Sequence, residues 1–226
     1  MSFDWPKEFD RYLDELIEWN KKFNLTSITD REEAKSKHFY DSLTLKEAFD
    51  FSSKEMSVID VGSGAGFPGL PMKMIFPNIR LTLLDATAKK TRFIEHIIAL
   101  FDLKGAEAVW ARAEDYAKEK KDRYDAAFCR ALAPLGVAAE LCLPFIKKGG
   151  RLFAMKGADI DDELKSSENA LKALGGAIEK IVETRVPLAA DGKRGLLNRS
   201  IIVVEKTADT PSNFPRKAGL PKKRPL

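Results

Sequence analysis

The segment 58–69 constrains the fold more than any other part of the 226-residue chain. It reads Val-Ile-Asp-Val-Gly-Ser-Gly-Ala-Gly-Phe-Pro-Gly, an apolar run followed by a turn with a glycine at every second position. We expect a buried strand at 56–61, a tight turn, and a helix that begins near residue 69. The first turn of that helix presents unpaired N–H groups to a ligand. Such a strand-turn-helix unit is typical of α/β folds that bind nucleoside-containing molecules.

Strands and helices alternate after residue 56. The pattern predicts seven strands, at 56–61, 80–85, 107–110, 125–130, 151–155, 177–187 and 196–206. A helix follows each of the first five, whereas a basic loop at 188–195 joins the last two. We therefore expect an α/β fold with a seven-stranded, mostly parallel sheet covered on both faces, in which the last strand is antiparallel.

The chain divides into three expected parts. We expect an N-terminal helical cap, 1–53, made of two helices at 4–23 and 31–49. Asp4 is the expected N-cap of the first helix. The alternating unit is the domain 54–206. The proline-rich and basic tail, 207–226, is expected to be extended or disordered until something orders it.

Two common nucleotide-binding patterns do not fit the glycine turn. Phe67 stands where the dinucleotide fingerprint has its third glycine, and Leu70 stands where a phosphate-binding loop has its lysine. Asp60 precedes the turn, where it can pair with a cationic group through the turn or through water. Asp85 ends the next strand, where a carboxylate can accept both hydroxyls of a ribose. These features predict S-adenosylmethionine, held by Gly62, Gly64 and Gly66; the alternative is a tight turn with purely structural glycines.

With these residues assembled, the chain resembles the RsmG (GidB) family, the bacterial methyltransferases of guanine N7 in small-subunit (16S) ribosomal RNA. The resemblance covers nearly the whole chain. It is carried by the segments 19–28, 37–43, 60–71, 84–85, 112–114, 130–131 and 155–157 and by the tail 210–226. It implies a Rossmann-like class I methyltransferase fold with S-adenosylmethionine as the cofactor.

The resemblance also implies roles along the cofactor, from its methionine end to its adenine. The residues concerned are Gly62, Phe67, Asp85, Ala86, Thr87, Ala113 and Glu114. The first two would contact the methionine end, the segment 85–87 would lie along the ribose, and 113–114 would border the adenine. Arg130 would lie between the cofactor and the target base. Many relatives have serine and a longer apolar residue at 86–87, so the detail of the ribose contact is not carried over.

Guanine N7 is an unusual methyl acceptor because it has an in-plane lone pair and no proton to lose. An enzyme for this atom needs alignment and water exclusion but no general base. The segment 128–134 lacks the Asp/Asn-Pro-Pro-aromatic signature of amino-group methyltransferases. Cys129 lacks the preceding proline usual in cytosine-C5 enzymes, so we expect it to be an inert strand residue. In-line displacement without a base follows as the expected chemistry.

Three side chains are candidates to touch the target base. Arg130 ends the fourth strand, Lys156 ends the fifth, and His38 shares a helix face with Asp41 and Ser42. Each has a plainer alternative, which is a structural salt bridge for Arg130, a solvated lysine for Lys156 and a domain-interface histidine for His38.

The positive charge of the chain is concentrated in its tail. The formal net charge is +4, and residues 210–226 carry five basic residues and no acid. Residues 1–57 carry nine basic and thirteen acidic residues, so they are not the expected RNA face. Phosphate contacts supply salt-dependent affinity. The predicted RNA contacts are Lys193, Arg194, Arg199, Arg216, Lys217, Lys222, Lys223 and Arg224.

The expected partner is 16S rRNA or the 30S subunit, and we expect a cytoplasmic monomer without a metal or membrane association. No apolar run approaches the ~20 residues of a membrane span. Two other functions stay open from the residues alone. One is a methyltransferase of another acceptor, and the other is a non-catalytic S-adenosylmethionine-binding module for RNA or assembly.

Overall fold

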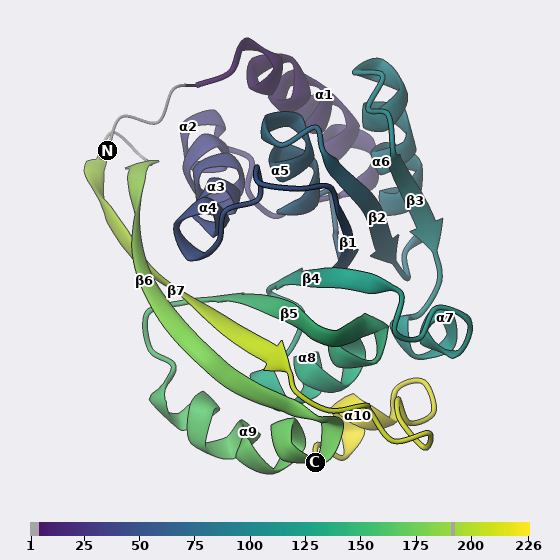
Figure 1. Cartoon of the computed structure of the whole chain (residues 1–226). Coiled ribbons are helices and arrows are strands. Elements are labelled where there is room, and N and C mark those ends of the chain that lie inside the picture. The colour runs from purple at the N-terminus through teal and green to yellow at the C-terminus, as the bar shows by residue number, and fades with distance from the viewer. Residues whose placement is uncertain (1–4, 191–192) are drawn as a thin grey trace.

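A single seven-stranded sheet forms the centre of the molecule (Figure 1). The computed structural model describes residues 5–190 and 193–226. The strand order is β3-β2-β1-β4-β5-β7-β6, with β1 to β5 parallel and β7 antiparallel to both of its neighbours. The strands are β1 (Met56–Val61), β2 (Ile79–Asp85), β3 (Ala106–Trp110), β4 (Tyr124–Arg130), β5 (Ile146–Lys156), β6 (Gly176–Ala190) and β7 (Lys193–Lys206). The predicted mostly parallel sheet is confirmed, including the antiparallel direction of its last strand.

Helices cover both faces of the sheet, because buried strands of a parallel sheet are apolar on both sides (Figure 1). One face carries α1 (Lys7–Phe23), α2 (Arg31–Ala34), a π-helical segment (Lys35–Tyr40), α3 (Asp41–Leu43), α4 (Leu45–Ala48), α5 (Gly69–Ile75) and α6 (Ala88–Leu100). The other carries α7 (Ala113–Glu119), α8 (Leu135–Cys142) with a short 3₁₀ turn (Leu143–Phe145), α9 (Asp161–Leu174) and α10 (Leu220–Lys223). Among the described residues, no helix is both long enough and apolar enough to cross a membrane.

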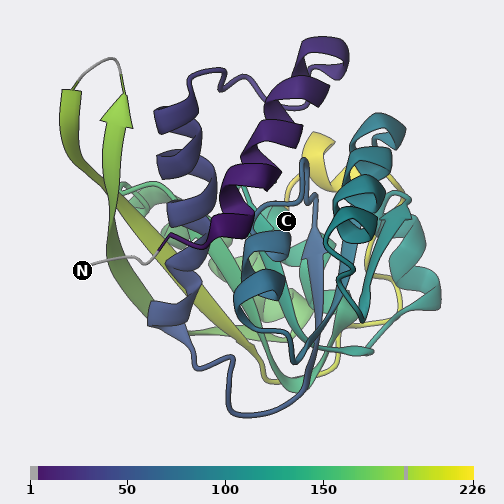
Figure 2. The same cartoon turned by 90° about the horizontal axis from the view of Figure 1, so that it is seen from above.

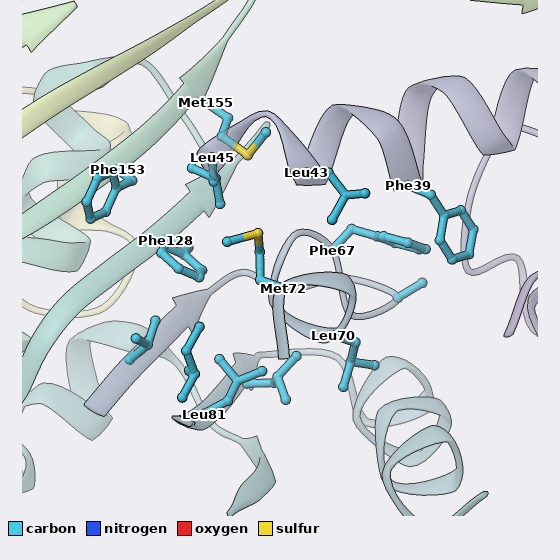
Figure 3. Packing of buried hydrophobic residues seen from close by; sticks show 14 of the residues in the cluster. Phe39, Leu43, Leu45, Phe67, Leu70, Met72, Leu81, Phe128, Phe153 and Met155 are labelled. Carbon is cyan, nitrogen blue, oxygen red and sulfur yellow. The ribbon is translucent and has the colours of Figure 1, made fainter. Parts of the chain in front are cut away.

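The N-terminal helices share one apolar core with the sheet. Phe39 from the π-helical segment, Phe67 from the glycine turn, and Phe128 and Phe153 from β4 and β5 belong to the same buried cluster (Figure 3). Phe9 of α1 packs against Phe39 with ring centroids 5.0 Å apart. The helices therefore pack on the sheet without a core of their own, and the boundary between residues 53 and 54 stays a prediction.

The first two helical segments differ from the sequence expectation in their details. Pro6 takes the N-cap position of α1 with an extended backbone, so the helix begins at Lys7, and the predicted cap Asp4 lies outside the described residues. The helix predicted at 31–49 is confirmed in its extent, since the chain is helical almost throughout from Arg31 to Ala48, but it is not one regular α-helix, because it contains the π-helical turn Lys35–Tyr40. π-Helical turns often occur at functional sites, and this one contains His38.

The strands β6 and β7 form a long hairpin that extends beyond the rest of the sheet, beside α2 and the π-helical segment (Figure 2). The basic loop predicted at 188–195 is wrong in its length, because the strands pair as far as Ala190 and Lys193. Lys193 and Arg194 are two predicted RNA contacts, and the structure does not describe their side chains.

The C-terminal tail is packed against the domain, and the prediction of an extended or disordered tail is therefore corrected. Thr210 and Pro221 are buried, and Phe214 and Leu226 pack on the apolar cluster of the second face. The tail ends in α10, which lies against α8 (Figure 1). The tail is ordered because its apolar side chains, Phe214 and Leu226, pack on the apolar surface of the domain.

Candidate active site

The glycine turn leaves β1 where the strand order reverses, with β2 on one side and β4 on the other. Ligands of open α/β sheets bind at this point. Gly62, Gly64 and Gly66 have φ values of 72°, 60° and 91°, the left-handed region that favours glycine. A Cβ atom on Gly62 would lie 2.6 Å from Leu132 Cδ1, whereas on Gly64 it would meet only a carbonyl oxygen 4.0 Å away. The middle of the turn is therefore open toward a ligand.

Asp60 lies beneath this turn and does not reach the open side. Its side chain is fully buried, and Oδ2 accepts a hydrogen bond from the Gly69 backbone N–H at 2.8 Å. The second oxygen, Oδ1, is buried without a partner in the described structure. Burial raises the pKa of Asp60 to about 7. Asp60 can thus influence a cationic ligand only through the turn that separates them.

Asp85 ties the glycine turn to the end of β2. Its Oδ2 accepts a hydrogen bond from the Gly64 N–H at 2.9 Å, and its Oδ1 accepts one from the Thr87 N–H at 2.8 Å. A carboxylate oxygen has two lone pairs, so each oxygen can accept a further bond from a ribose hydroxyl. Ala86, the next residue, is exposed beside it. This arrangement fits the ribose of a nucleoside cofactor.

Phe67 holds the turn against the N-terminal helices. Its ring is stacked with the ring of Tyr12 at 5.2 Å and with the ring of His38 at 4.7 Å between centroids. The Tyr12 hydroxyl donates a hydrogen bond to the Ala65 carbonyl oxygen at 2.5 Å, within the turn itself. Phe67 is buried, so its contact with a ligand is confined to a small edge. The conformation of the turn therefore depends on α1 and on the π-helical segment.

Arg130, at the carboxyl end of β4, is fixed by the same helices. Its Nη1 donates to the Lys37 carbonyl oxygen at 2.7 Å and to Asp41 Oδ2 at 3.1 Å, and its Nη2 donates to His38 Nδ1 at 3.3 Å. The other oxygen of Asp41 accepts a hydrogen bond from Arg199 Nε of β7 at 2.9 Å. One buried carboxylate thus joins two arginines from strands β4 and β7, which are separated in the sheet by β5 alone.

His38 is neutral in this arrangement. Because a guanidinium can only donate, Nδ1 of His38 is an acceptor, and the ring proton lies on Nε2, which contacts Thr26 Oγ1 at 2.9 Å. Burial, together with the charge of Arg130, lowers the pKa of His38 to about 3. Both ring nitrogens are engaged, so the geometry supports a role in holding Arg130. Ser42, on the same helical segment, donates to the His38 carbonyl oxygen.

Lys156 is not a freely solvated lysine. Its Nζ donates to the Ala133 carbonyl oxygen at 2.8 Å and forms an ion pair with Glu163 of α9. It lines a cavity of about 430 Å³ at the carboxyl ends of β4 and β5. Among the residues that line this cavity are Lys37, His38, Asp41, Arg130, Met155, Lys156 and Arg199. The three predicted base contacts, Arg130, Lys156 and His38, are brought together here.

Some of the residues predicted to contact the adenine or the RNA are bound to other residues of the chain, and the others are at least partly exposed. Ala113 is partly exposed, whereas Glu114 is buried and accepts a hydrogen bond from the Gly219 N–H of the tail. Arg216 forms an ion pair with Glu140, and Arg199 forms one with Asp41. The remaining tail cations are exposed; they are Lys217, Lys222, Lys223 and Arg224.

Sequence reasoning missed three residues that support this site. Tyr12 holds the turn, Thr26 Oγ1 accepts a hydrogen bond from His38 Nε2, and Glu163 pairs with Lys156. Tyr12 lies on the apolar face of α1, so its position in the sequence indicates a core residue. Nothing in the helical pattern indicates that its hydroxyl binds the glycine turn. Thr26 and Glu163 belong to a loop and to a solvated helix, and no local pattern marks either.

Comparison with known proteins gives a consistent match over most of the chain. The family model GidB, described as rRNA small subunit methyltransferase G, matches residues 6–192. A protein of Halalkalibacterium halodurans named ribosomal RNA small subunit methyltransferase G is 43% identical over 221 residues, which is 97% of this chain and 90% of the relative. A protein of the same name from Oceanobacillus iheyensis is 41% identical and covers 100% of this chain and 93% of its own length.

Solved structures resemble the fold at low sequence identity. M. jannaschii TYW2 in complex with AdoMet matches with a TM-score of 0.56 and 14% identity, over 74% of this chain and 76% of the other. The precorrin-6y C5,15-methyltransferase of Geobacter metallireducens matches with a TM-score of 0.56 and 16% identity, over 74% and 87% of the two chains. At this level the likeness concerns the sheet and its helices.

Proposed function

Because the chain belongs to the GidB family, the rRNA small subunit methyltransferases G, we propose that it methylates N7 of a guanine in 16S rRNA. The chain is an rRNA methyltransferase that uses S-adenosylmethionine. The acceptor atom, the roles of the residues at the site and the form of the substrate are part of the same proposal.

The residues around the glycine turn fit this cofactor. The open face of Gly64 gives room for the ligand, and the left-handed backbone of the turn leaves no side chain there. In this proposal Asp85, which binds the Gly64 N–H, also accepts the ribose hydroxyls, and Glu114 faces the adenine. The buried acceptor Oδ1 of Asp60 keeps the region under the turn negative when ionised. When bound, the cofactor supplies a methyl group on a sulfonium, an electrophile that needs only an aligned lone pair.

The target guanine enters the cavity at the ends of β4 and β5. Arg130 has five N–H groups, and three are used by Lys37, Asp41 and His38. The remaining two are available to guanine O6, the acceptor next to N7. His38 thereby acts as a positioning residue for Arg130. Lys156, at the end of the neighbouring strand β5, adds positive charge to the lining of the same cavity.

One observation carries the choice of N7 as the acceptor atom. Among the described residues that line this cavity, the only carboxylate and the only imidazole are both engaged, Asp41 with two arginines and His38 with Arg130 and Thr26. A general base must be within hydrogen-bond reach of the proton that it removes and must have a lone pair to receive it. Guanine N7 has no proton, so a site of this kind suits it. In-line displacement then depends on alignment and on the exclusion of water.

Chemical cleavage of the rRNA tests this proposal. Small-subunit RNA from a strain that lacks the gene is treated with borohydride and aniline, which cleave at N7-methylguanine, and the products are mapped by primer extension. We expect one cleavage site to disappear, to return with a plasmid-borne wild-type gene, and to stay absent with Arg130→Gln. If the deletion strain keeps every cleavage site of the wild type, the proposal is contradicted.

The form of the substrate is open to the same chemistry in vitro. We propose that a monomer of this chain acts in the cytoplasm on a ribosomal particle, with the exposed cations Lys217, Lys222, Lys223 and Arg224 on the phosphates. Methylation of purified 30S subunits is compared with that of naked 16S rRNA at rising salt. Equal rates on both substrates would argue against the particle.

A further inference from the structure

The most unexpected contact of the tail is a buried ion pair. Glu140 stands on α8 among apolar neighbours and is 1% exposed. Arg216 satisfies both of its oxygens, since the backbone N–H and Nε donate to Oε1 at 2.9 and 2.8 Å and Nη2 donates to Oε2 at 2.6 Å. An unpaired buried carboxylate is strongly destabilising. Arg216 is therefore held by Glu140 and keeps only 20% of its side-chain surface exposed, which makes it a weaker candidate for a phosphate contact than the exposed cations of the tail.

A second contact lies three residues further along the tail. The Gly219 N–H donates to Glu114 Oε1 at 2.8 Å, and Glu114 is buried at the start of α7. Gly219 has a φ of 81°, a conformation that suits glycine and points this N–H toward α7. The segment 216–219 thus links α8 to the carboxylate that we place beside the adenine of the cofactor.

The rest of the tail fixes this segment from both sides. Upstream, the Thr210 hydroxyl donates to the Leu174 carbonyl oxygen at 2.8 Å and accepts from Lys206 Nζ at 2.7 Å. Downstream, Pro221 is buried and α10 lies against α8 (Figure 1). The segment 216–219 therefore has little freedom to move away from Glu114.

We propose that the tail completes the adenine end of the cofactor site. Arg216, anchored on Glu140, sets the position of Gly219, and the Gly219 N–H holds Glu114 Oε1. Glu114 then presents Oε2 to the exocyclic amino group of the adenine. Arg216 is a positioning residue for the cofactor, and the RNA contacts of the tail are its exposed cations, Lys217, Lys222, Lys223 and Arg224. This inference rests on the proposed placement of Glu114.

Binding of S-adenosylhomocysteine to the full-length protein, measured by calorimetry, tests the inference without any turnover. We expect Arg216→Gln and Gly219→Ala to weaken binding about tenfold, the effect of roughly one charge-assisted hydrogen bond, and Arg216→Lys to recover part of it. Lys217→Gln is the matched control, since this exposed neighbour should leave the cofactor affinity unchanged and weaken binding of 30S subunits. Asp85→Ala serves as the reference for a weakened ribose contact.

A second ligand separates positioning from general destabilisation. S-inosylhomocysteine carries a carbonyl oxygen in place of the adenine amino group, so wild type should bind it more weakly. In Arg216→Gln and Gly219→Ala this preference should shrink toward equality, which a simple loss of stability would not cause. If Arg216→Gln does not fold, Gly219→Ala carries the test, because an added Cβ there meets no atom within 4 Å and the change acts only through the strained left-handed backbone that directs the N–H to Glu114.

The possible failures are distinguishable. If Glu114→Gln keeps the full preference for S-adenosylhomocysteine, the placement of Glu114 at the adenine is wrong. If Glu114→Gln loses the preference while Arg216→Gln and Gly219→Ala retain it, the placement stands and the role of the tail is overturned. Loss of 30S affinity in Arg216→Gln with unchanged cofactor affinity would make Arg216 an RNA contact instead.

Discussion

Asp60 shows how a single residue can link the stability of this site to pH. Its carboxyl group is fully buried, with one oxygen on the Gly69 N–H and the other without a partner. Desolvation raises its pKa from 3.8 to about 7 in the folded protein. The folded state therefore retains a proton that the unfolded chain releases above pH 4. The resulting stabilisation is fully present below the unfolded pKa and is lost as pH rises toward 7.

We predict that Asp60→Asn flattens this pH dependence. Between pH 5 and 7 the free energy of unfolding of the wild type should fall relative to that of the variant, by at most about 1.4 kcal/mol per pH unit. Urea unfolding at half-unit steps from pH 5 to 8 measures the difference. Asp159→Asn, at an exposed acid, is the control and should run parallel to wild type. Parallel curves for Asp60→Asn as well would show that this carboxyl titrates normally.

Two elements that are far apart in the chain meet at Asp41. The π-helical segment ends at Tyr40 and directs the Asp41 carboxylate toward Arg130 of β4 and Arg199 of β7. The hairpin of β6 and β7 is thereby tied to the N-terminal helices, which it also touches along its length. The wall of the proposed guanine cavity thus depends on contacts between elements.

Asp41→Ala should destabilise the protein by about 3 kcal/mol, because it leaves two partly buried guanidinium groups without their shared partner. The loss lies at the low end of the usual range for a broken buried ion pair, because Arg130 and Arg199 keep 16% and 23% of their side-chain surface exposed. Urea unfolding gives the value. Asp10→Ala removes an exposed partner of Arg31 and should cost less than about 1 kcal/mol. Similar losses for the two variants would mean that the Asp41 pairs contribute little.

At the scale of the whole molecule, one face of the sheet shares its core with the N-terminal helices. Phe9, Tyr12 and Phe39 pack in the same cluster as Phe67 and Phe128. The second face is similarly shared with the tail, through Phe214 and Leu226. The N-terminal helices and the tail expected from the sequence therefore each share a core with the sheet of the middle part.

A chain that begins at residue 54 should not fold cooperatively, because it would expose the apolar face that α1 and the π-helical segment cover. Circular dichroism and thermal unfolding, run beside the full chain, measure this. A sharp unfolding transition in the shortened chain would instead make 54–226 an independent domain.

The sequence by itself determined the order of strands and helices, the antiparallel last strand and the glycine turn. These features follow from local rules, namely the spacing of apolar residues and the left-handed backbone that Gly62, Gly64 and Gly66 permit. They also placed Arg130, Lys156 and Asp85 at strand ends that face one edge of the sheet. The family resemblance of the same segments identified the class of reaction.

Only the tertiary structure decided which of these charged groups are occupied. Arg216 lies 76 residues from Glu140, Gly219 lies 105 residues from Glu114, and Arg130 lies 92 residues from His38. No local pattern in a sequence encodes the partner of a charge at such distances. An exposed arginine and an arginine in a buried ion pair look identical in a sequence. Which of the two it becomes depends on the surface against which the folded chain packs it.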